Sequence, residues 1–551
     1  MYNKMLLTAM LFIALLPAFG QTAKFGSFSY EGRDARFDKS VDSRSQYLNP
    51  IVSGFYPDPT VLRVGDTYWL ANSTFGYFPG VPLFKSKDLV NWQQVGNVLD
   101  RPSQLNLKES DVSGGVFAPH LSYNPKNKTY YMTTMSGGVV FYVKSKDPEQ
   151  GWSEPVRMKY GGMDTSFFFD KDGRAWVVYC ASPFDQSINK DGRTAIHMNE
   201  FDWRGDSIKA KTWELTTGSK AMEKPRWTEG PHIYKVGKYY YLVCAEGGTE
   251  QLHSEVVFRS KSITGPYEDY DGNPILTQRD LSDTGRADPV SCTGHGDMVQ
   301  AKDGKWWAVF LGCRPYEHDL YNTGRETFLL PVTWKDGWPV ILPKGEPVPT
   351  VVSKEGLMPE GENMNTGNIR YTEDFKAQKL GPQWIFLRNP AMSDYKVGDG
   401  LTVTPTAATL SGKESPSCAF FRQKNTSFTA ETELSFTPTG NAVAGITVFQ
   451  SDKNHLVLGK TLVGGSPAIT LTMTDNGITK VIGSARLTET GASVRLRIDG
   501  DGRYYSFAYA AENGGWHTVA QGVDCQCLSK TYSGGFVGTT IGLYASLKNM
   551  E

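Results

Sequence analysis

The chain has 551 residues, enough for two or three domains rather than one. Its 57 Lys and Arg residues nearly balance 58 Asp and Glu residues, and this net charge of -1, without any basic block, argues against nucleic acid as a partner. A count of 57 glycines and an aromatic share of 12% are typical of a turn-rich, all-β protein with exposed stacking surfaces.

The first twenty residues, "MYNKMLLTAMLFIALLPAFG", have the layout of a secretory signal. Lys4 supplies the positive charge, residues 5–16 are almost all apolar, and Ala18 and Gly20 are small residues of the kind that precede a cleavage site. The apolar run is short for a membrane span, and no cysteine for lipid attachment precedes Cys180. We therefore expect an exported protein, periplasmic or secreted, without a membrane anchor and with a mature chain that begins at Gln21.

The seven cysteines are scattered and odd in number, so they do not form the disulfide framework of a small secreted domain. Cys180, Cys244 and Cys313 lie in apolar, strand-like runs and are expected to be buried. The pair Cys525 and Cys527 has no second pair of ligands, which argues against a zinc site.

Residues 21–46 are polar and charged, and we expect a leader segment there rather than a core element. Five similar pieces follow: "FYPDPTVLRVGDTYWLANS", "VFAPHLSYNPKNKTYYMTTM", "GMDTSFFFDKDGRAWVVYCA", "TEGPHIYKVGKYYYLVCAEG" and "GHGDMVQAKDGKWWAVFLGC". Each has a polar head, a short alternating strand, a turn such as "VGD" or "KDG", and an aromatic apolar strand. Such repeats predict a five-bladed β-propeller over residues 47–345, with an ordinary β-sandwich as the alternative.

A different pattern follows the repeats. Residues 346–370 are rich in Pro, Gly and Glu and read as a linker. Residues 371–551 contain short strands at regular spacing, with a strong hairpin turn at Asn476-Gly477, and predict a C-terminal β-sandwich.

Three of the five repeat heads carry a carboxylate: Asp58 in "GFYPDPTV", Asp164 after "GGM" and Glu229 in "WTEGPH". The innermost strands of a propeller surround one axis, so these heads converge at one mouth of the channel. The prolines on both sides of Asp58 restrict its backbone. Crowded carboxylates raise one another's pKa, and such an array is costly unless it serves a function.

Two facing carboxyl groups are the catalytic groups that glycoside hydrolysis needs. One donates a proton to the leaving oxygen, and the other activates water or attacks the anomeric carbon. A third can orient the acid and raise its pKa. Each residue also has a simpler interpretation. Asp58 and Asp164 could be turn residues, and Glu229 a surface acid.

The sequence resembles glycoside hydrolase family 43, in particular its β-xylosidase and α-L-arabinofuranosidase members with an added C-terminal sandwich. The resemblance covers residues 47 to about 545 and rests on "NPIVSGFYPDPTV", "STFGYFPGVPLFKSKDLVNW", "GVFAPHLSYN", "WTEGPHIYKVGKYYYLVCAEGGT", "GHGDMV", "WWAVFLGCRP" and "GRETFLLPVTW". It implies an inverting mechanism in which Asp58 is the general base, Glu229 the general acid, and Asp164 the residue that tunes the pKa of the acid.

The resemblance also implies substrate-binding residues. Phe75 is similar to the aromatic residue that lines the terminal sugar pocket, and Phe117 stands where many relatives carry Trp. His295 is similar to the channel histidine beneath the site, for which a structural role is the alternative, and Arg325 to the arginine that binds a sugar hydroxyl. Tyr532 or Phe536 would be the residue through which the sandwich closes the pocket.

We therefore predict an exo-acting inverting hydrolase that releases terminal pentose, foremost a β-1,4-xylosidase acting on xylan-derived oligosaccharides. The alternatives are an α-L-arabinofuranosidase, an endo-arabinanase and a non-catalytic sugar-binding propeller. The expected partner is an oligosaccharide containing xylose or arabinose. No organic cofactor is expected, because carboxylates supply the chemistry. A calcium ion near His295 or in the sandwich is left open, since no acidic calcium loop is present.

Overall fold

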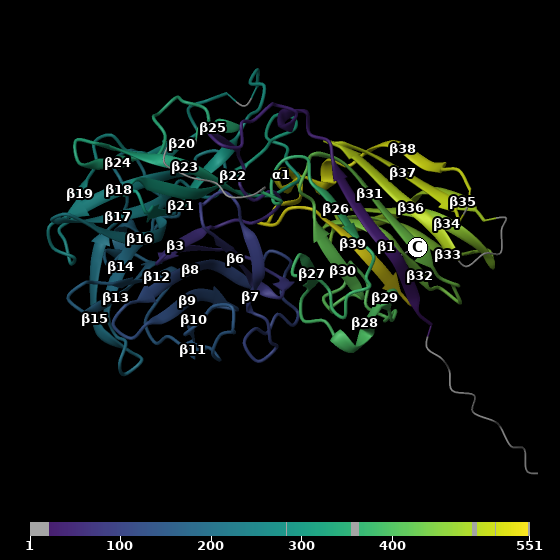
Figure 1. The fold of residues 1–551 in the computed structure, drawn as a ribbon, viewed down its shortest axis with the longest axis horizontal. Coiled ribbons are helices and arrows are strands. Elements are labelled where there is room, and N and C mark those ends of the chain that lie inside the picture. Colours follow the sequence, from purple (N-terminus) through teal and green to yellow (C-terminus); the bar gives the residue numbers. More distant parts are fainter. Residues whose placement is uncertain (1–20, 283, 354–362, 488–492, 513, 549–551) are drawn as a thin grey trace, which may run out of the picture.

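The computed structural model describes residues 21–282, 284–353, 363–487, 493–512 and 514–548. Within them the chain forms two lobes, a propeller built from the first part of the sequence and a sandwich built mainly from the second, with two strands from the first part (Figure 1). The expected signal, residues 1–20, lies outside the described part, as does the middle of the expected linker. Among the described residues, no helix has the length and apolarity needed to cross a bilayer.

The propeller has five blades, as the repeats predict, and each blade is built from strands that are close in sequence. Blade 1 comprises β3 (Thr60–Val64), β4 (Thr67–Ala71), β6 (Gly80–Ser86) and β7 (Gln93–Leu99). Blade 2 comprises β8 (Val116–Asn124), β9 (Thr129–Ser136), β10 (Val139–Ser145) and β11 (Val156–Arg157). Blade 3 comprises β12 (Met163–Phe169), β13 (Ala175–Ala181), β14 (Ala195–Asp202) and β15 (Ser207–Thr216).

Blade 4 comprises β16 (Glu229–Val236), β17 (Tyr239–Glu246), β18 (Ser254–Ser260), β19 (Glu268–Asp269) and β20 (Leu276–Thr277). Blade 5 comprises β21 (Ser291–Gln300), β22 (Trp306–Cys313), β23 (Glu326–Lys335) and β24 (Trp338–Val340). The first strands β3, β8, β12, β16 and β21 each contact the next, and β21 contacts β3, so they surround the central channel.

The ring is closed without exchange of a strand between the first and last blades. Asp297 on β21 accepts hydrogen bonds at 2.9 Å from the hydroxyl of Thr60 and the backbone N–H of Val61 on β3. A second tie joins the ends of the domain, where β2 (Gln46–Leu48) pairs with β25 (Val351–Ser353). These contacts hold the five first strands in one ring around the site.

The sandwich consists of two antiparallel sheets around a shared apolar core. The first sheet contains β1 (Ala23–Gly32), β26 (Arg370–Glu373), β28 (Tyr395–Gly398), β29 (Gly400–Val403), β31 (Ser427–Ser435), β36 (Ser493–Asp501), β37 (Tyr504–Ala511) and β38 (His517–Asp524). The second contains β5 (Tyr77–Phe78), β27 (Trp384–Leu387), β30 (Cys418–Arg422), β32 (Val443–Ser451), β33 (Asn454–Val463), β34 (Ser466–Asp475), β35 (Ile478–Arg486) and β39 (Thr540–Ser546).

In the described part of the chain, helical structure is confined to short turns. These are Ala35–Phe37, Gln186–Ile188, Met392–Asp394, Gln526–Leu528 and α1 (Lys530–Ser533). The hairpin expected at Asn476-Gly477 is confirmed: it joins β34 to β35, and both residues have positive φ. All seven cysteines are buried and unbridged, including Cys180, Cys244 and Cys313 as expected.

The expectation that residues 21–46 form a leader outside any core is wrong. β1 pairs with β31 along its length, and Phe25, Phe28 and Tyr30 are at most 1% exposed in the sandwich core. Figure 1 shows this strand crossing the sandwich, far in sequence from its neighbours. The segment looks polar because only one face is buried, and a bulge between Phe25 and Ser27 interrupts the alternation that would have marked a strand.

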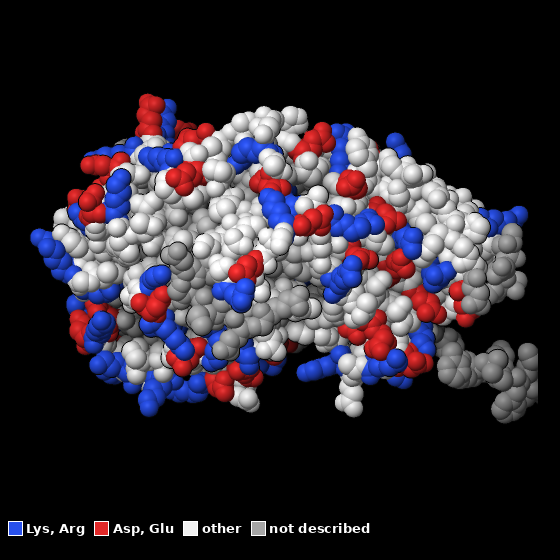
Figure 2. All heavy atoms as spheres, turned by 45° about the horizontal axis from the view of Figure 1, so that its top comes forward, with Lys and Arg blue, Asp and Glu red and all other residues white. Residues whose placement is uncertain are grey.

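The two lobes share backbone pairing as well as side-chain contacts. β5, within blade 1 in sequence, pairs with β27 of the sandwich, and Phe55 and Phe75 pack in one cluster with Phe420 and Val537. On the face shown in Figure 2, Lys and Arg side chains are interspersed with Asp and Glu, without a large patch of one sign. The cluster of Phe55, Phe75, Phe420 and Val537 shows that the lobes meet through an apolar interface next to the mouth of the propeller channel.

Candidate active site

The backbone around the channel mouth departs from regular strand geometry at many of the residues that face it. Positive φ values occur at Asp58 (50°), Phe75 (50°), Asp164 (54°), Trp227 (50°) and His295 (49°). The first strands β8, β12, β16 and β21 also have register shifts close to the mouth. Left-handed backbone at non-glycine residues costs about 1–3 kcal/mol each, and bulges re-aim side chains. The local distortions turn polar side chains inward that a regular strand would direct elsewhere.

Asp58 is a buried carboxylate held by three neighbours. Its Oδ2 accepts a hydrogen bond of 2.6 Å from the hydroxyl of Ser73, and its Oδ1 lies 3.3 Å from Nη1 of Arg325 and 3.8 Å from Nδ1 of His295. Burial pushes the pKa of Asp58 upward, but the charges of Arg325 and His295 and the Ser73 hydrogen bond outweigh it, so the pKa lies below its ordinary value. Asp58 is therefore ionised, as a general base must be.

Glu229 has the opposite electrostatic environment. Burial, followed by the charges of Asp164 and Asp58, raises the pKa of Glu229 well above its ordinary value, and Arg325 opposes this only partly. The pKa of Asp164 is also raised, chiefly by burial and by Asp58, against the charge of His295. The raised pKa lets Glu229 hold the proton that a general acid donates.

Asp164 is positioned beside the acid through the backbone. Its Oδ2 accepts a hydrogen bond of 3.1 Å from the N–H of Gly230, the residue that follows Glu229. Gly230 has φ of +57°, and a Cβ there would lie 3.0 Å from Nε2 of His295. Glycine is thus required in "EGPH", because it lets the acid, its modulator and the channel histidine approach one another.

These groups line a pocket of about 230 Å³. Its walls include Asp58, Asp164, Glu229, His295, Arg325, Phe75, Phe117 and Phe536, together with Ala118, Met163, Trp227, Gly248 and Thr249. Every site residue predicted from the sequence is therefore brought to one place, with the exception of Tyr532.

Three phenylalanines make the apolar wall. The rings of Phe75 and Phe536 are stacked at 5.7 Å with an interplanar angle of 26°, and Phe117 meets Phe75 edge-on at 5.5 Å. The guanidinium of Arg325 lies 5.4 Å from the ring centre of Phe536. Phe536 belongs to the sandwich, and its backbone N–H donates a hydrogen bond of 2.8 Å to the hydroxyl of Ser113. The second lobe thus completes the pocket of the first.

Of the two candidates for the closing residue, Phe536 lines the pocket and Tyr532 does not. Tyr532 is 50% exposed on α1 and lines a different hollow, beside Asp452 and Asn476. The two residues lie four positions apart in "TYSGGFVG", and Gly534 and Gly535, both with positive φ, turn the chain between them. The sequence shows the two glycines but not the direction in which they turn the chain, so it could not tell which of the two aromatic residues faces the pocket.

Sequence reasoning missed Ser73, which binds Asp58, and Trp227, a pocket residue that is 45% exposed. Both lie within quoted motifs, "STFGYFPG" and "WTEGPH", next to assigned residues. Their place next to assigned residues is the sequence signal that could have found them. Separately, potential ligand atoms of Asp164, Glu229 and His295 lie within 4.8 Å of one another, so these residues could also hold a cation.

A pocket that holds one carboxyl group with a lowered pKa and another with a raised pKa fits the hydrolysis of glycosidic bonds. The family model described as Glycosyl hydrolases family 43 matches residues 47–339, and that of the Beta xylosidase C-terminal Concanavalin A-like domain matches residues 372–551. The chain therefore belongs to glycosyl hydrolase family 43.

Relatives of known name are similar over nearly the whole chain. The non-reducing end alpha-L-arabinofuranosidase BoGH43B of Bacteroides ovatus is 36% identical, with 92% of each chain covered. A xylosidase/arabinosidase of Butyrivibrio fibrisolvens is 35% identical, over 90% of this chain and 95% of that one. The crystal structure of a GH43_12 protein from the capybara gut metagenome superposes with a TM-score of 0.89 at 36% identity, covering 96% of this chain and all of the other.

Proposed function

We propose that the protein is an exo-acting, inverting glycosidase that releases single terminal pentose units, foremost β-1,4-linked xylose from xylan-derived oligosaccharides. The observation that carries this proposal is the opposite direction of the pKa shifts of Asp58 and Glu229 within one pocket. Asp58 takes a proton from water, which attacks C1, while Glu229 protonates the departing oxygen. Asp164 raises the pKa of Glu229 and thereby keeps this proton in place.

The shape of the pocket supports exo action on a short terminal unit. Its volume of about 230 Å³ is below the range of roughly 300–1,000 Å³ that is common for ligand pockets, and Phe536 of the sandwich walls one side. An endo-acting enzyme needs an open groove that lets a polymer pass through. Phe75 and Phe536 provide apolar contact for a sugar ring, and Arg325 donates to its hydroxyls.

A second candidate is an α-L-arabinofuranosidase with the same acid and base. Two observations favour it: the relative named above with that activity, and the presence of Phe117 in the wall, where a larger Trp would narrow the pocket. A furanose and a pyranose place the anomeric carbon and leaving oxygen in similar positions, so the shape of the wall decides between them.

Initial rates on aryl β-D-xyloside and aryl α-L-arabinofuranoside, compared at equal enzyme concentration, test the proposal. We expect turnover of both, with a higher kcat/KM on the xyloside, and loss of both in Asp58→Asn. A higher kcat/KM on the arabinofuranoside would favour the second candidate. Absence of turnover on either pentoside, with binding retained, would mean a sugar-binding propeller instead.

A further inference from the structure

A second group of polar side chains lies in the channel, deeper than the catalytic pocket. His120 is on β8, His232 on β16 and Asp297 on β21, each two or three positions beyond the pocket residues Ala118, Glu229 and His295 on the same strands. Because the first strands run side by side around the axis, these later positions form the next layer inward. None of the three residues takes part in the hydrolysis described above.

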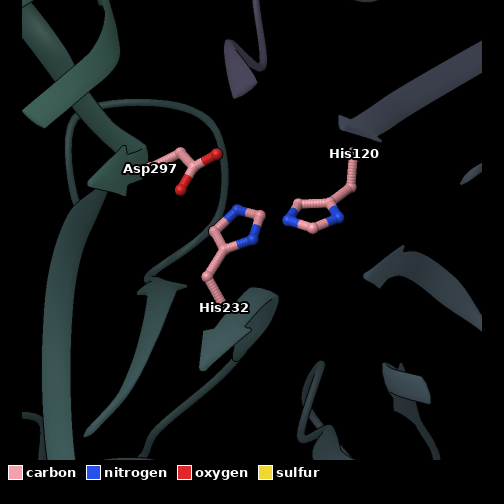
Figure 3. Close-up of side chains that lie close together, drawn as sticks. All are labelled: His120, His232 and Asp297. Carbon is pink, nitrogen blue, oxygen red and sulfur yellow. The ribbon is translucent and has the colours of Figure 1, made fainter. Parts of the chain in front are cut away.

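The three side chains lie close enough together to share one ion, with the rings of His120 and His232 stacked at 4.9 Å between centroids. One potential ligand atom from each residue lies within 4.8 Å of the other two. Figure 3 shows the imidazole of His232 between the imidazole of His120 and the carboxylate of Asp297. His232 is only 6% exposed, yet its Nδ1 is buried without a hydrogen-bond partner. A buried nitrogen without a partner is costly in an ordinary core and is readily explained as a ligand.

The side chains are held in position by the surrounding blades. Asp297 accepts from Thr60 and Val61 of blade 1, and also from the hydroxyl of Tyr234. Nδ1 of His120 accepts a long hydrogen bond of 3.4 Å from the backbone N–H of Phe167, and this contact orients the ring. Such outer contacts orient ligands without occupying all of their lone pairs.

Two imidazoles and one carboxylate offer the ligand atoms in this layer. Neutral imidazoles paired with one carboxylate suit Zn²⁺ and its neighbours among the transition metals, whereas Ca²⁺ and Mg²⁺ prefer oxygen ligands throughout.

The site is also accessible from the end of the channel opposite the catalytic pocket. A hollow of about 310 Å³ there is lined by His120 and Asp297, together with Tyr234 and later residues of the first strands, such as Arg63 and Gln300. Water can complete the coordination from this side. We propose that His120, His232 and Asp297 bind one divalent transition-metal ion of the Zn²⁺ type, which links blades 2, 4 and 5. This ion is structural and is distinct from any cation near His295.

Titration of chelator-treated protein with Zn²⁺, in competition with a chromophoric chelator, tests the proposal. We expect one equivalent to bind, a rise in melting temperature of a few degrees at about 100-fold excess over Kd, and visible absorption bands with Co²⁺. His232→Asn and, independently, His120→Asn remove the bound equivalent, the rise and the bands. The matched control is His455→Asn in the sandwich, which also removes a buried histidine with an unpartnered Nε2 and should bind as wild type does.

Failure of the wild-type chain to bind an equivalent would overturn the proposal, whatever the variants do. Equal loss in His455→Asn would assign the effect to general destabilisation and would also overturn it. Loss in His295→Asn, with binding kept in both His120→Asn and His232→Asn, would place the ion in the catalytic pocket and contradict the assignment to this layer.

Discussion

Asp58 carries its carboxylate on a left-handed backbone, with φ of 50°, between two prolines. Aspartate tolerates this region better than most residues, but the position before a proline adds restriction. The conformation is maintained by Ser73 and Arg325, which fix both carboxylate oxygens. The flanking prolines predicted that the backbone is restricted. The sign of φ depends on partners 15 and 267 residues away and could not be predicted.

The roles of the two acids give the first prediction. Asp58→Asn should lower kcat about 100- to 10,000-fold on every substrate, because water activation is always required. Glu229→Gln should lose a similar factor on a natural disaccharide and far less on an aryl glycoside whose leaving group hardly needs a proton. Rates of both variants on both substrates check this. Equal loss in Glu229→Gln on the two substrates would remove Glu229 from the acid role.

The pH profile of kcat/KM gives the second prediction. The base must be ionised, so activity rises with pH through the lowered pKa of Asp58; the acid must be protonated, so activity falls as pH rises through the raised pKa of Glu229. Asp164→Asn removes a neighbour that raises the pKa of Glu229, and the alkaline limb should therefore move to lower pH. An alkaline limb unchanged or moved upward in Asp164→Asn would show that Asp164 does not tune the acid.

At the scale of elements, the hairpins were predictable and β1 was not. Turns such as Gly237-Lys238 between β16 and β17 depend on a few adjacent residues, so they can be predicted from the sequence. β1 depends on a partner strand about 400 residues away, with Phe28 opposite Thr432. Likewise, the pocket wall made by Phe536 depends on how the lobes meet, and no local pattern encodes that contact.

The contribution of the sandwich gives the third prediction. Phe536→Ala removes a ring stacked on Phe75, and aromatic contacts of this kind are worth about 0.5–1.5 kcal/mol beyond their buried area, or roughly a 2- to 10-fold effect. We expect a decrease in kcat/KM of at least that size. Tyr532→Ala, four residues earlier on exposed α1, is the control and should keep wild-type kinetics. A lowered kcat/KM in Tyr532→Ala with wild-type kinetics in Phe536→Ala would make Tyr532 the closing residue.

At the scale of the whole molecule, a buried ionic network joins the N-terminal segment, the propeller and the sandwich. Arg314 is fully buried; its Nη1 lies 2.8 Å from Asp34, and its Nη2 donates to Glu326 at 2.9 Å and to the carbonyl of Lys424 at 2.7 Å. Asp34 in turn accepts from the backbone N–H of Ser427 at 2.7 Å. Glu326 directly follows the pocket arginine Arg325, so this network fixes a pocket residue relative to both lobes.

The network gives the fourth prediction. Asp34→Ala leaves Arg314 short of a counter-charge, and breaking such a buried pair costs about 3–5 kcal/mol. The midpoint of urea unfolding should therefore fall markedly. The matched control is Asp399→Asn. Asp399 forms an ion pair with Lys24, but the Asp399 side chain is 97% exposed, so this substitution should change the midpoint of unfolding little. Equal midpoints for the two variants would mean that the network does not stabilise the fold.

The configuration of the first sugar released tests the central claim most directly. In inverting enzymes the acid and base stand roughly 6.5–9.5 Å apart to admit water, against about 5–5.5 Å in retaining ones. With Asp58 as base and Glu229 as acid on different blades, proton NMR of a β-xyloside reaction should show α-xylose first, followed by mutarotation. Initial appearance of β-xylose, or a covalent glycosyl adduct on Asp58, would contradict the account and make Asp58 a nucleophile.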